Sequence, residues 1–449
     1  MTRRDDDPGF KVRLAAWEVM RYGGTAPLRE LNRIAAQHEL EDRDRALLRN
    51  LVATTYRRLG TLRALVDQFA QRKPKPEVAT ALHLGLAQLF FLDRVPDHAA
   101  VSSTVDATNA VLDIARGRFV NAVLRSAIRA RREGHCGDPR RDIPLTNWHL
   151  DEPFMRDPQG ANPLLWVTDA LSIPSSLAKA WANRFGDETM RRLATDALRE
   201  PPLSVQVLDE DLESVLIELQ TDDLEPLAVG GHSLLFAPEA TGAIVASDLF
   251  QRGAITIQGA TAARAAALVG AAEGERILDL CAAPGGKTAV MAAAGAHVVA
   301  CDVDESKLER LASTVARFGL TERVELCLTD GTSSLGESGF DAVLIDAPCS
   351  NTGVLAARPE ARWRYGPKTM RDLRELQARL LREGAERVRP GGRLVWSTCS
   401  LEPSENVGQV KGFLSERKDW QLEESFESLP DLTDGPADGG WAARLRHSG

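Results

Sequence analysis

From Gly253 to the C-terminus, strand-like and helical stretches alternate strictly. Apolar runs suited to buried strands are separated by longer helical patterns; in chain order the runs read RILDL, HVVACD, RVELCLTD, AVLIDAP and RLVWSTCS. Parallel neighbours in a sheet need a crossover connection, which is usually a helix. The alternation therefore predicts a doubly wound parallel sheet, that is, a Rossmann-like α/β domain over residues 251–449.

The N-terminal part of the chain has a different pattern. Apolar residues recur at three- and four-residue spacing through residues 1–135, which predicts one all-α domain. Residues 136–168 are rich in Gly, Pro, Asp and Asn without a clean period, so we expect a linker there. Helical stretches and short strand-like runs alternate over residues 169–250, which indicates a small α+β subdomain. The chain is thus predicted to be multidomain.

Composition excludes several classes of protein. The chain has 43% hydrophobic and 27% charged residues, as a soluble globular protein does. The polar start MTRRDDDPGF lacks the apolar core of a signal peptide, and the apolar stretch LGLAQLFFL is too short to span a membrane. The six cysteines form no CxxC pair and no zinc-type cluster, so we expect a cytoplasmic protein without a structural metal. The net charge of −9 argues against nucleic-acid binding over the whole surface, but it does not exclude local basic faces.

The stretch RILDLCAAPGGKTAVMAAAG, residues 276–295, reads as a strand, a Pro-Gly-Gly turn and a helix. Such a turn brings backbone close to a ligand, and the helix N-terminus offers free N–H donors. A phosphate-binding P-loop would need Gly where Cys281 stands, and the dinucleotide pattern GxGxxG is absent. The residues therefore favour a nucleoside-type ligand without a pyrophosphate.

Acidic residues end the next three predicted strands, at Asp302, Asp330 and Asp346. The carboxyl ends of such strands meet at the crevice where doubly wound sheets bind ligands, and a carboxylate there can accept hydrogen bonds from ribose hydroxyls. S-adenosylmethionine, a nucleoside with a cationic sulfonium, fits this acidic edge. The alternative is that each Asp only caps the helix that follows it.

Two cysteines stand at the ends of predicted strands. Cys301 and Cys327 suit inert core positions, but Cys349 and Cys399 each follow a strand and begin a polar loop. A thiolate at that edge is a strong nucleophile. Methylation of carbon 5 of a pyrimidine needs one, because thiolate addition at carbon 6 makes carbon 5 able to attack a methyl sulfonium.

Several motifs together resemble the RNA cytosine-5 methyltransferases: DLCAAPGGKT, DAPCSNTG, RPEARW, RPGGRLVWSTCSLEPSEN and GGWAARLR. The stretches LGLAQLFFLDRVPDHAAVSSTVD and RGRFVNAVLRSAIR resemble the NusB-like domain of one branch, the bacterial 16S ribosomal RNA methyltransferase B (Fmu/Sun) family. The resemblance extends from the first helices to residue 446. It implies a NusB-like RNA-binding domain over 1–135, a small RNA-binding subdomain over 169–250, and a methyltransferase domain over 251–449.

The resemblance also implies roles for single residues. Cys399 would attack the base, Cys349 would assist release of the product, and Asp346 would hydrogen-bond the cytosine ring near N3. The reaction would be S-adenosylmethionine-dependent methylation of C5 of a cytosine in 16S ribosomal RNA through a covalent adduct between cysteine and C6. The family's cofactor contacts carry over onto Cys281, Ala282, Ala283, Pro284, Gly285, Gly286, Lys287, Asp302, Asp330 and Asp346.

Basic residues between Arg358 and Arg393, and the helix RSAIRARR, suggest a phosphate-contacting surface. The target base must leave its stack to reach Cys399, so we expect a single-stranded or loop region of RNA as partner and a monomeric enzyme. Trp363 is either an aromatic contact for the RNA or a core residue.

This sequence departs from the family pattern at positions that support the pocket rather than carry the reaction. The family usually has Gly at Asn351, a pair of Arg at Ala356 and Ala357, Asp at Gly259 and Gln at Ala263; its RVN motif appears here as QVL, with Gln206 and Leu208.

Two alternatives to the 16S enzyme remain open: a transfer-RNA cytosine-5 methyltransferase, and a non-catalytic RNA-binding ribosome-assembly factor that has kept the fold. Both cysteines and Asp346 are present, which argues against the second, because a pure binder needs neither thiol.

Overall fold

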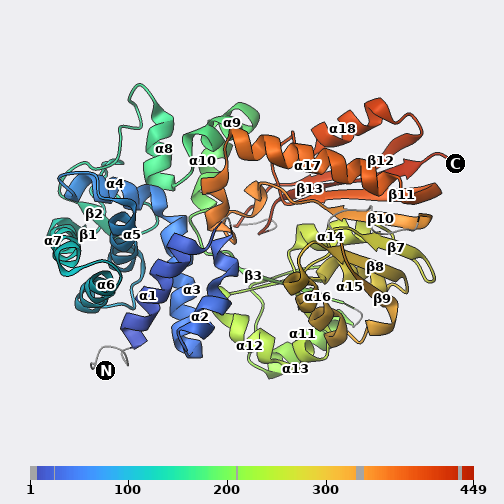
Figure 1. The fold of residues 1–449 in the computed structure, drawn as a ribbon, viewed down its shortest axis with the longest axis horizontal. Helices are drawn as coiled ribbons and strands as arrows, with labels where there is room; N and C mark the ends of the chain where they lie inside the picture. Colours follow the sequence, from blue (N-terminus) through green and yellow to red (C-terminus); the bar gives the residue numbers. More distant parts are fainter. Residues whose placement is uncertain (1–7, 25, 209–210, 330–337, 433–436) are drawn as a thin grey trace. The chain divides into compact units, whose positions relative to one another are not determined.

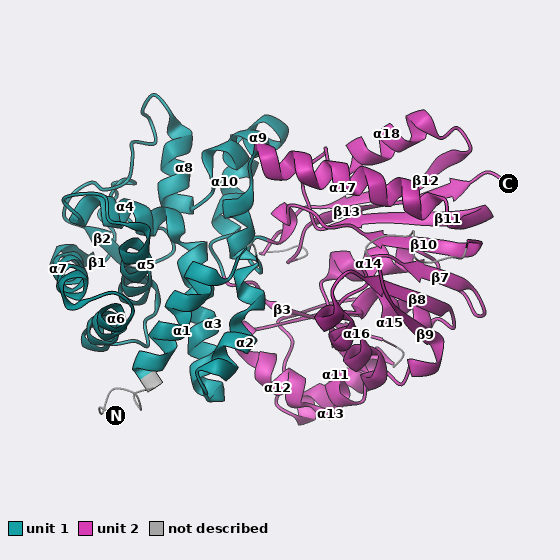
Figure 2. Ribbon diagram, in the orientation of Figure 1, with its two compact units in different colours: residues 1–199, 355–366 teal, residues 200–354, 367–449 magenta. Residues whose placement is uncertain are grey.

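The computed structural model describes residues 8–24, 26–208, 211–329, 338–432 and 437–449. The chain divides into two compact units (Figure 2): residues 1–199 with 355–366, and residues 200–354 with 367–449. In the part of the chain that the structure describes, no helix combines the length and the apolar character that a bilayer crossing requires.

The first unit is helical (Figure 1). Its core joins Val12, Leu51, Leu82 and Val120 from four different helices, each fully buried. Helix α5 (Pro76–Phe91) is apolar on nearly all sides, so it lies buried among the others, and Pro76 at its first position suits a helix start. The other helices are α1 (Pro8–Tyr22), α2 (Leu31–Gln37), α3 (Asp42–Arg57), α4 (Leu59–Phe69), α6 (Asp97–Val111), α7 (Ile114–Ala130), α8 (Pro163–Leu171), α9 (Ser175–Phe185) and α10 (Asp187–Asp196).

Residues 136–168, predicted as a linker, carry some regular structure. Strand β1 (Arg131–Glu133) pairs antiparallel with β2 (Trp148–Leu150), and α8 begins at Pro163. The unit boundary falls at Arg199, so α9 and α10 belong to the helical unit although the sequence pattern grouped them with the α+β region. The sequence-based domain boundaries themselves remain a prediction.

A later segment of the chain, residues 355–366, also belongs to the first unit. It contains the 3₁₀ turn η5 (Pro359–Arg364), and its Arg362 is fully buried. The Arg362 guanidinium donates to the carbonyls of Ala197 at 2.8 Å and Leu355 at 3.0 Å, so it ties the segment 355–366 to the end of helix α10. Burial, followed by the charge of Arg57, lowers the pKa of Arg362 to about 9.

The second unit begins with a small antiparallel sheet of order β4-β5-β3-β6. Its strands are β3 (Leu203–Val207), β4 (Ala228–Gly230), β5 (Ser233–Phe236) and β6 (Ile255–Ile257). Helices α11 (Leu212–Thr221), α12 (Thr241–Ala246) and α13 (Asp248–Gln251) accompany it. Val205, Val215, Phe236 and Ile244 form its core, which confirms the predicted α+β character of this region.

The large sheet of the second unit has the order β12-β13-β11-β10-β7-β8-β9. The five predicted strands are parallel neighbours: β7 (Arg276–Asp279), β8 (His297–Asp302), β9 (Val324–Leu328), β10 (Phe340–Asp346) and β11 (Val388–Thr398). The sequence reading did not foresee β12 (Trp420–Ser428) and β13 (Gly440–His447); β13 runs antiparallel to both of its neighbours, so the sheet is mixed.

Helices cover both faces of this sheet (Figure 1). One face packs Leu278, Val343 and Trp396 against α17 (Pro367–Ala385) and α18 (Val407–Glu416). The other packs Ile277 and Leu344 against α14 (Ala260–Leu268), α15 (Gly286–Ala293) and α16 (Glu305–Arg317). Successive strand residues point to opposite faces, which is why each strand supplies both cores. The predicted Rossmann-like fold is confirmed.

Candidate active site

The loops that carry the two cysteines leave adjacent parallel strands at the same edge. In the register of β10 and β11, Asp346 lies opposite Ser397, so Cys349 and Cys399 both emerge just beyond the paired segment. Their Sγ atoms are 3.2 Å apart, and both side chains are half-buried. The tertiary structure thus brings together two thiols that are fifty positions apart in sequence.

The two thiols are not equivalent. The hydrogen bond with Cys399, together with burial, holds the pKa of the Cys349 thiol well above its usual range. Cys349 is therefore kept as a neutral thiol that can donate to the Cys399 sulfur. Hydrogen bonding to an anion favours the charged form of the acceptor, so this arrangement suits Cys399 as the thiolate of the pair.

A buried carboxylate holds both loops in place. Glu405 is fully buried and accepts from the backbone N–H of Ser350 at 2.9 Å, from the Ser400 hydroxyl at 2.5 Å and from Gln377 Nε2 at 2.9 Å. Ser350 follows Cys349 and Ser400 follows Cys399, so one side chain fixes the backbone beside each thiol. Sequence reasoning gave no role to Glu405, although it lies within the quoted stretch SLEPSEN.

Asp346 stands between the cysteines and the predicted cofactor turn. Its carboxylate forms an ion pair with Lys287 at 2.7 Å and accepts from the Ser397 hydroxyl at 3.1 Å. Burial alone would lower the pKa of Lys287, but the interactions with Asp346, followed by those with Asp279 and Cys399, outweigh burial, and the net shift is upward. Lys287 thus stays an ammonium that supplies positive charge at this edge.

The turn after β7 and the first two residues of α15 together contain the seven consecutive residues predicted to contact a cofactor, 281–287. Gly285 has φ +103°, a conformation that a side chain would strain. A Cβ atom at Gly286 would lie 3.3 Å from Gln258 Nε2, which keeps this side of the turn narrow. Burial, and then the nearby carboxylates, raise the pKa of Cys281, so this third cysteine stays a neutral thiol.

Asp302 ends β8, as predicted, and is nearly buried. Its Oδ1 accepts from the Val303 N–H at 2.8 Å and from Lys307 Nζ at 2.7 Å. Apolar Val303 and Leu328, 66% and 55% exposed, flank it at the ends of β8 and β9 and offer a surface for a planar base. Asp330, the other predicted contact on this side, lies outside the described residues.

Comparison with known proteins identifies the family. Residues 266–434 match the model described as 16S rRNA methyltransferase RsmB/F, and residues 15–129 match the NusB family. The ribosomal RNA small subunit methyltransferase B of Cronobacter sakazakii is 30% identical over 431 residues, which cover 91% of this chain and 92% of that protein. The chain belongs to the ribosomal RNA small subunit methyltransferase B family.

A second relative supports the family, and two solved structures share the fold. The probable ribosomal RNA small subunit methyltransferase B of Synechocystis is 31% identical, in an alignment that covers 88% of this chain and 86% of that protein. The crystal structure of PH0851 has the same fold, with a TM-score of 0.75 at 22% identity and 98% of each chain covered. NSun6 from Pyrococcus horikoshii with SFG matches 62% of this chain and 98% of its own, at a TM-score of 0.54 and 20% identity.

As a member of this methyltransferase B family, the chain uses S-adenosylmethionine as cofactor and acts on RNA. The residues present fit the cofactor. Gln258 Oε1 is buried beside the turn and has no hydrogen-bond partner among the described residues. A buried acceptor left unpaired costs about 1–3 kcal/mol, so a ligand that donates there would relieve that cost. Sequence reasoning did not single out Gln258, although it had compared the surrounding segment IQGATAA with the family pattern.

A family departure near this turn has a structural explanation. A Cβ atom at Gly259, where the family usually has Asp, would lie 2.2 Å from Asp438 Oδ2. The Asp438 carboxylate instead reaches in from the C-terminal segment and accepts the Thr261 N–H at 3.3 Å, at the start of α14. Burial raises the pKa of Asp438. A carboxylate from a distant part of the chain thus occupies the space of the missing side chain.

Three further departures, at Gln206, Ala263 and Leu208, make hydrogen bonds within the second unit. Gln206 is buried in β3, and its Nε2 donates to the Gln258 backbone carbonyl at 3.0 Å. This hydrogen bond holds the backbone of the residue whose Oε1 has no partner among the described residues. Ala263 lies within α14 and donates its N–H to the Gly259 carbonyl at 3.0 Å. Leu208 follows β3 and donates its N–H to the Ala254 carbonyl at 3.0 Å.

Part of the predicted basic surface proves to be structural. Arg362 is buried in the first unit, and Arg393 pairs with Glu275 at 2.5 Å and is 8% exposed. Trp363 donates to the Tyr56 carbonyl at 2.8 Å and lies under the Arg63 guanidinium, so it packs within the helical unit. Exposed cations remain along α17 and are the candidates for phosphate contact: Lys368, Arg371, Arg374, Arg379 and Arg382.

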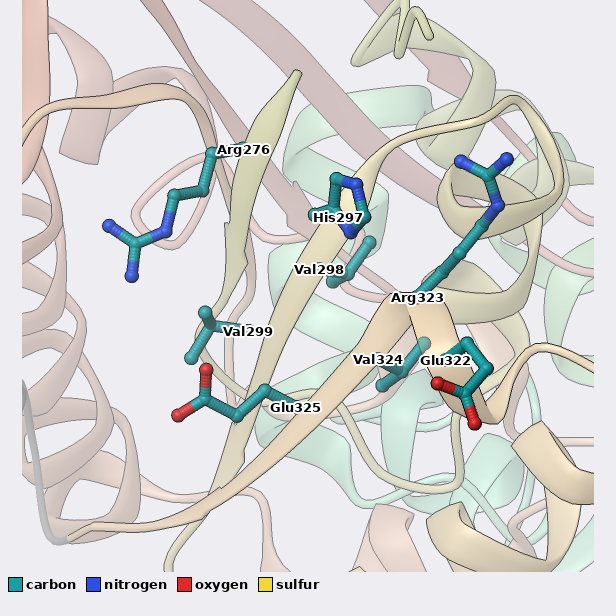
Figure 3. A pocket seen from close by; sticks show the side chains of 8 residues that line it. All are labelled: Arg276, His297, Val298, Val299, Glu322, Arg323, Val324 and Glu325. Carbon is teal, nitrogen blue, oxygen red and sulfur yellow. The ribbon is translucent and has the colours of Figure 1, made fainter. Parts of the chain in front are cut away.

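A pocket elsewhere on the sheet is not this site. It lies at the first residues of three strands (Figure 3), which are Arg276, His297 and Val324. Doubly wound sheets bind ligands at the carboxyl ends of their strands, and this pocket lies at the amino ends. Its acidic and basic side chains are mixed, so its charge does not select a ligand.

Proposed function

We propose that the protein methylates carbon 5 of a cytosine in 16S ribosomal RNA through a covalent bond between Cys399 and carbon 6 of the base. The observation that carries this proposal is the pair of thiols 3.2 Å apart at the carboxyl edge of the sheet, next to the turn that fits S-adenosylmethionine. A methyltransferase acting on a nucleophilic nitrogen or oxygen would need no thiol. Two thiols at one site suit a reaction in which a bond to the base forms and later breaks.

Cys399 is the group that attacks. Its thiolate adds to carbon 6, which gives carbon 5 the electron density of an enamine. Asp346 lies opposite Ser397 in the register of β10 and β11 and is held by Lys287 and Ser397; our proposal places its carboxyl group against N3 of the ring. The proton that N3 gains comes from the Lys287–Asp346 pair, which acts as general acid.

The second half of the reaction restores the enzyme. S-adenosylmethionine, when bound, supplies the methyl group that carbon 5 takes. The carbon 5 proton then passes to water, the carbon–sulfur bond breaks with its electron pair returning to Cys399, and N3 returns its proton to the Lys287–Asp346 pair. We assign assistance of this step to Cys349, whose raised pKa keeps it protonated beside Cys399.

The RNA must present an unstacked base, because Cys399 is half-buried and cannot reach a base within a helix. The exposed cations of α17 are proposed to contact phosphates near the target. The NusB-like helices favour ribosomal over transfer RNA as substrate.

Bisulfite mapping of ribosomal and transfer RNA from a deletion strain tests the proposal. One cytosine of 16S RNA should lose its methyl group and regain it with the wild-type gene but not with Cys399→Ala. Loss at a transfer-RNA position instead would make this a transfer-RNA enzyme. No loss in any RNA, with normal binding to ribosomal RNA, would favour the non-catalytic assembly factor.

A further inference from the structure

Asn351 stands in the Cys349 loop with φ +60°, in the left-handed region that favours glycine. Its neighbours hold that conformation in place: Ser350 donates its N–H to Glu405 at 2.9 Å, and Thr352 Oγ1 accepts the Leu401 N–H at 2.9 Å. A residue without a side chain would adopt this backbone at no cost. Asn351 bears the strain of this backbone conformation, so its side-chain contacts are of interest.

The Asn351 carboxamide contacts both cysteines. Its Nδ2 lies 2.8 Å from the Cys349 carbonyl oxygen, and its Oδ1 lies 3.3 Å from Cys399 Sγ. The carbonyl oxygen can only accept, so the amide must turn its N–H₂ group toward Cys349. Its oxygen is then left for Cys399, and since this oxygen can only accept, the Cys399 thiol must donate.

The direction of the next hydrogen bond follows from this. The Cys399 proton is directed to Asn351, so in the contact of 3.2 Å between the two sulfurs the donor is Cys349. The three residues thus form a closed ring of donors and acceptors, from Cys349 thiol to Cys399 thiol to Asn351 amide and back to the Cys349 carbonyl. The amide is the member whose direction is fixed by its chemistry.

We propose that Asn351 is a positioning residue that fixes the direction of the hydrogen bonds at the cysteine pair, so that Cys349 donates to Cys399 and the resting Cys399 thiol donates to the Asn351 amide oxygen. The inference rests on the proposed function, in which Cys399 is the nucleophile. Beyond the proposed function, we infer that the Asn351 amide oxygen holds the Cys399 thiol neutral before reaction. This hydrogen bond is lost when Cys399 ionises. Asn351 therefore sets the pH at which the nucleophile becomes available.

Alkylation of the full-length protein by iodoacetamide across a pH series, with each cysteine quantified by mass spectrometry, measures this effect. Asn351→Gly removes the acceptor that stabilises the neutral thiol, so the pH of half-alkylation of Cys399 should fall by about half a unit, the scale of one weak hydrogen bond. Asn351→Asp places an anion against the same thiol and should raise that pH by a similar or larger amount.

Two internal controls make the result specific. Cys136 is exposed and should alkylate identically in every variant. Asp223, in the same unit, also has a positive φ of 56°, so Asp223→Gly gives the same backbone relief without touching the site. The acid limb of the methylation pH profile should move with Cys399 alkylation in Asn351→Gly, which a merely structural role would not cause.

The outcomes separate this inference from the proposed function. If the Asn351 variants alkylate Cys399 along the same profile as Asp223→Gly while Cys399→Ala abolishes methylation, Asn351 has no such role and the proposed function stands. If Cys399→Ala still methylates RNA, the proposed function fails whatever the alkylation shows. If Asn351→Asp does not fold, the downward shift in Asn351→Gly alone decides.

Discussion

The Sγ atoms of Cys349 and Cys399 lie 3.2 Å apart, although the two residues come from different loops. The contact depends on the adjacent parallel strands β10 and β11 and on Glu405, which bonds to the residue after each cysteine. In the proposed function the two thiols have different roles, so replacing each of them should cause a different failure.

Cys349→Ala should still attack and methylate the base but should not release it, whereas Cys399→Ala should form no bond at all. Blocking the second of two steps accumulates the intermediate between them. Each variant is incubated with small-subunit RNA and radiolabelled cofactor and run on a denaturing gel. A slow, denaturant-resistant band is expected with Cys349→Ala only; the reverse pattern would mean that Cys349 is the nucleophile.

Mild oxidation should join the two cysteines. A disulfide needs its sulfurs about 2.05 Å apart, so they must approach by about 1 Å. Hydrogen peroxide takes two electrons and two protons from the thiols and becomes two waters as the sulfur–sulfur bond forms. Methylation should fall and return with dithiothreitol, and peptide mapping should find the Cys349–Cys399 link. Irreversible loss with Cys399 converted to a sulfinic acid would contradict this.

Asp302→Ala should weaken binding of S-adenosylmethionine by about 1–3 kcal/mol, the scale of losing a charge-assisted hydrogen bond. Asp304→Ala is the matched control, because Asp304 is an exposed carboxylate two positions on that caps α16 through Ser306. Titration calorimetry on both variants measures the difference. Equal affinity of Asp302→Ala and wild type would remove Asp302 from the cofactor site.

Asp279→Asn should become more stable relative to wild type as pH rises. Burial raises the pKa of Asp279 to about 7, and the charge of Asp346 adds to this effect. Between about pH 4 and pH 7 the folded state therefore holds a proton that the unfolded state loses, so wild-type stability falls through this window. Asn imitates the protonated carboxyl group, so the variant does not lose this stability; the gain over wild type at high pH is a few kcal/mol at most.

Urea unfolding of both proteins at pH 5 and pH 8, without cofactor, measures this difference. The stability of Asp279→Asn minus that of wild type should be larger at pH 8. Thr288→Val is the matched control: it removes the hydroxyl that donates to Asp279 at 2.7 Å but keeps the carboxyl group, so its stability should still fall as the pH rises. A difference that does not change with pH would show that Asp279 is ionised throughout.

Strands and their order of appearance were predictable from local pattern. Apolar runs such as those of β8 and β10 are short, and a helical stretch separates each from the next, which only a parallel sheet accommodates. From that topology the meeting of Cys349, Cys399 and Asp346 at one edge follows, because the carboxyl ends of parallel strands lie together. The β12–β13 pair was missed: β12 is largely exposed, and β13 begins with Gly440 after a polar stretch that reads as a loop.

Contacts between distant residues could not be predicted from the sequence. In the sequence Arg362 resembles a surface cation. In the structure it is buried and donates to backbone carbonyls at least 165 residues away along the chain. Glu405 reads like an exposed glutamate after a loop, yet four donors surround it. The burial of a charged group depends on which segments fold over it, and periodicity carries no information about that.

The sequence by itself determined the fold class, the family and the residue types that the reaction needs, because these depend on local period and on motifs of consecutive residues. The tertiary structure alone decided how those residues act on one another. It turned the Asn351 amide toward both cysteines, brought Asp438 into the space beside Gly259, and paired Lys287 with Asp346. Hydrogen bonds and ion pairs act over a few ångströms, and only the packing of distant segments sets distances of that size.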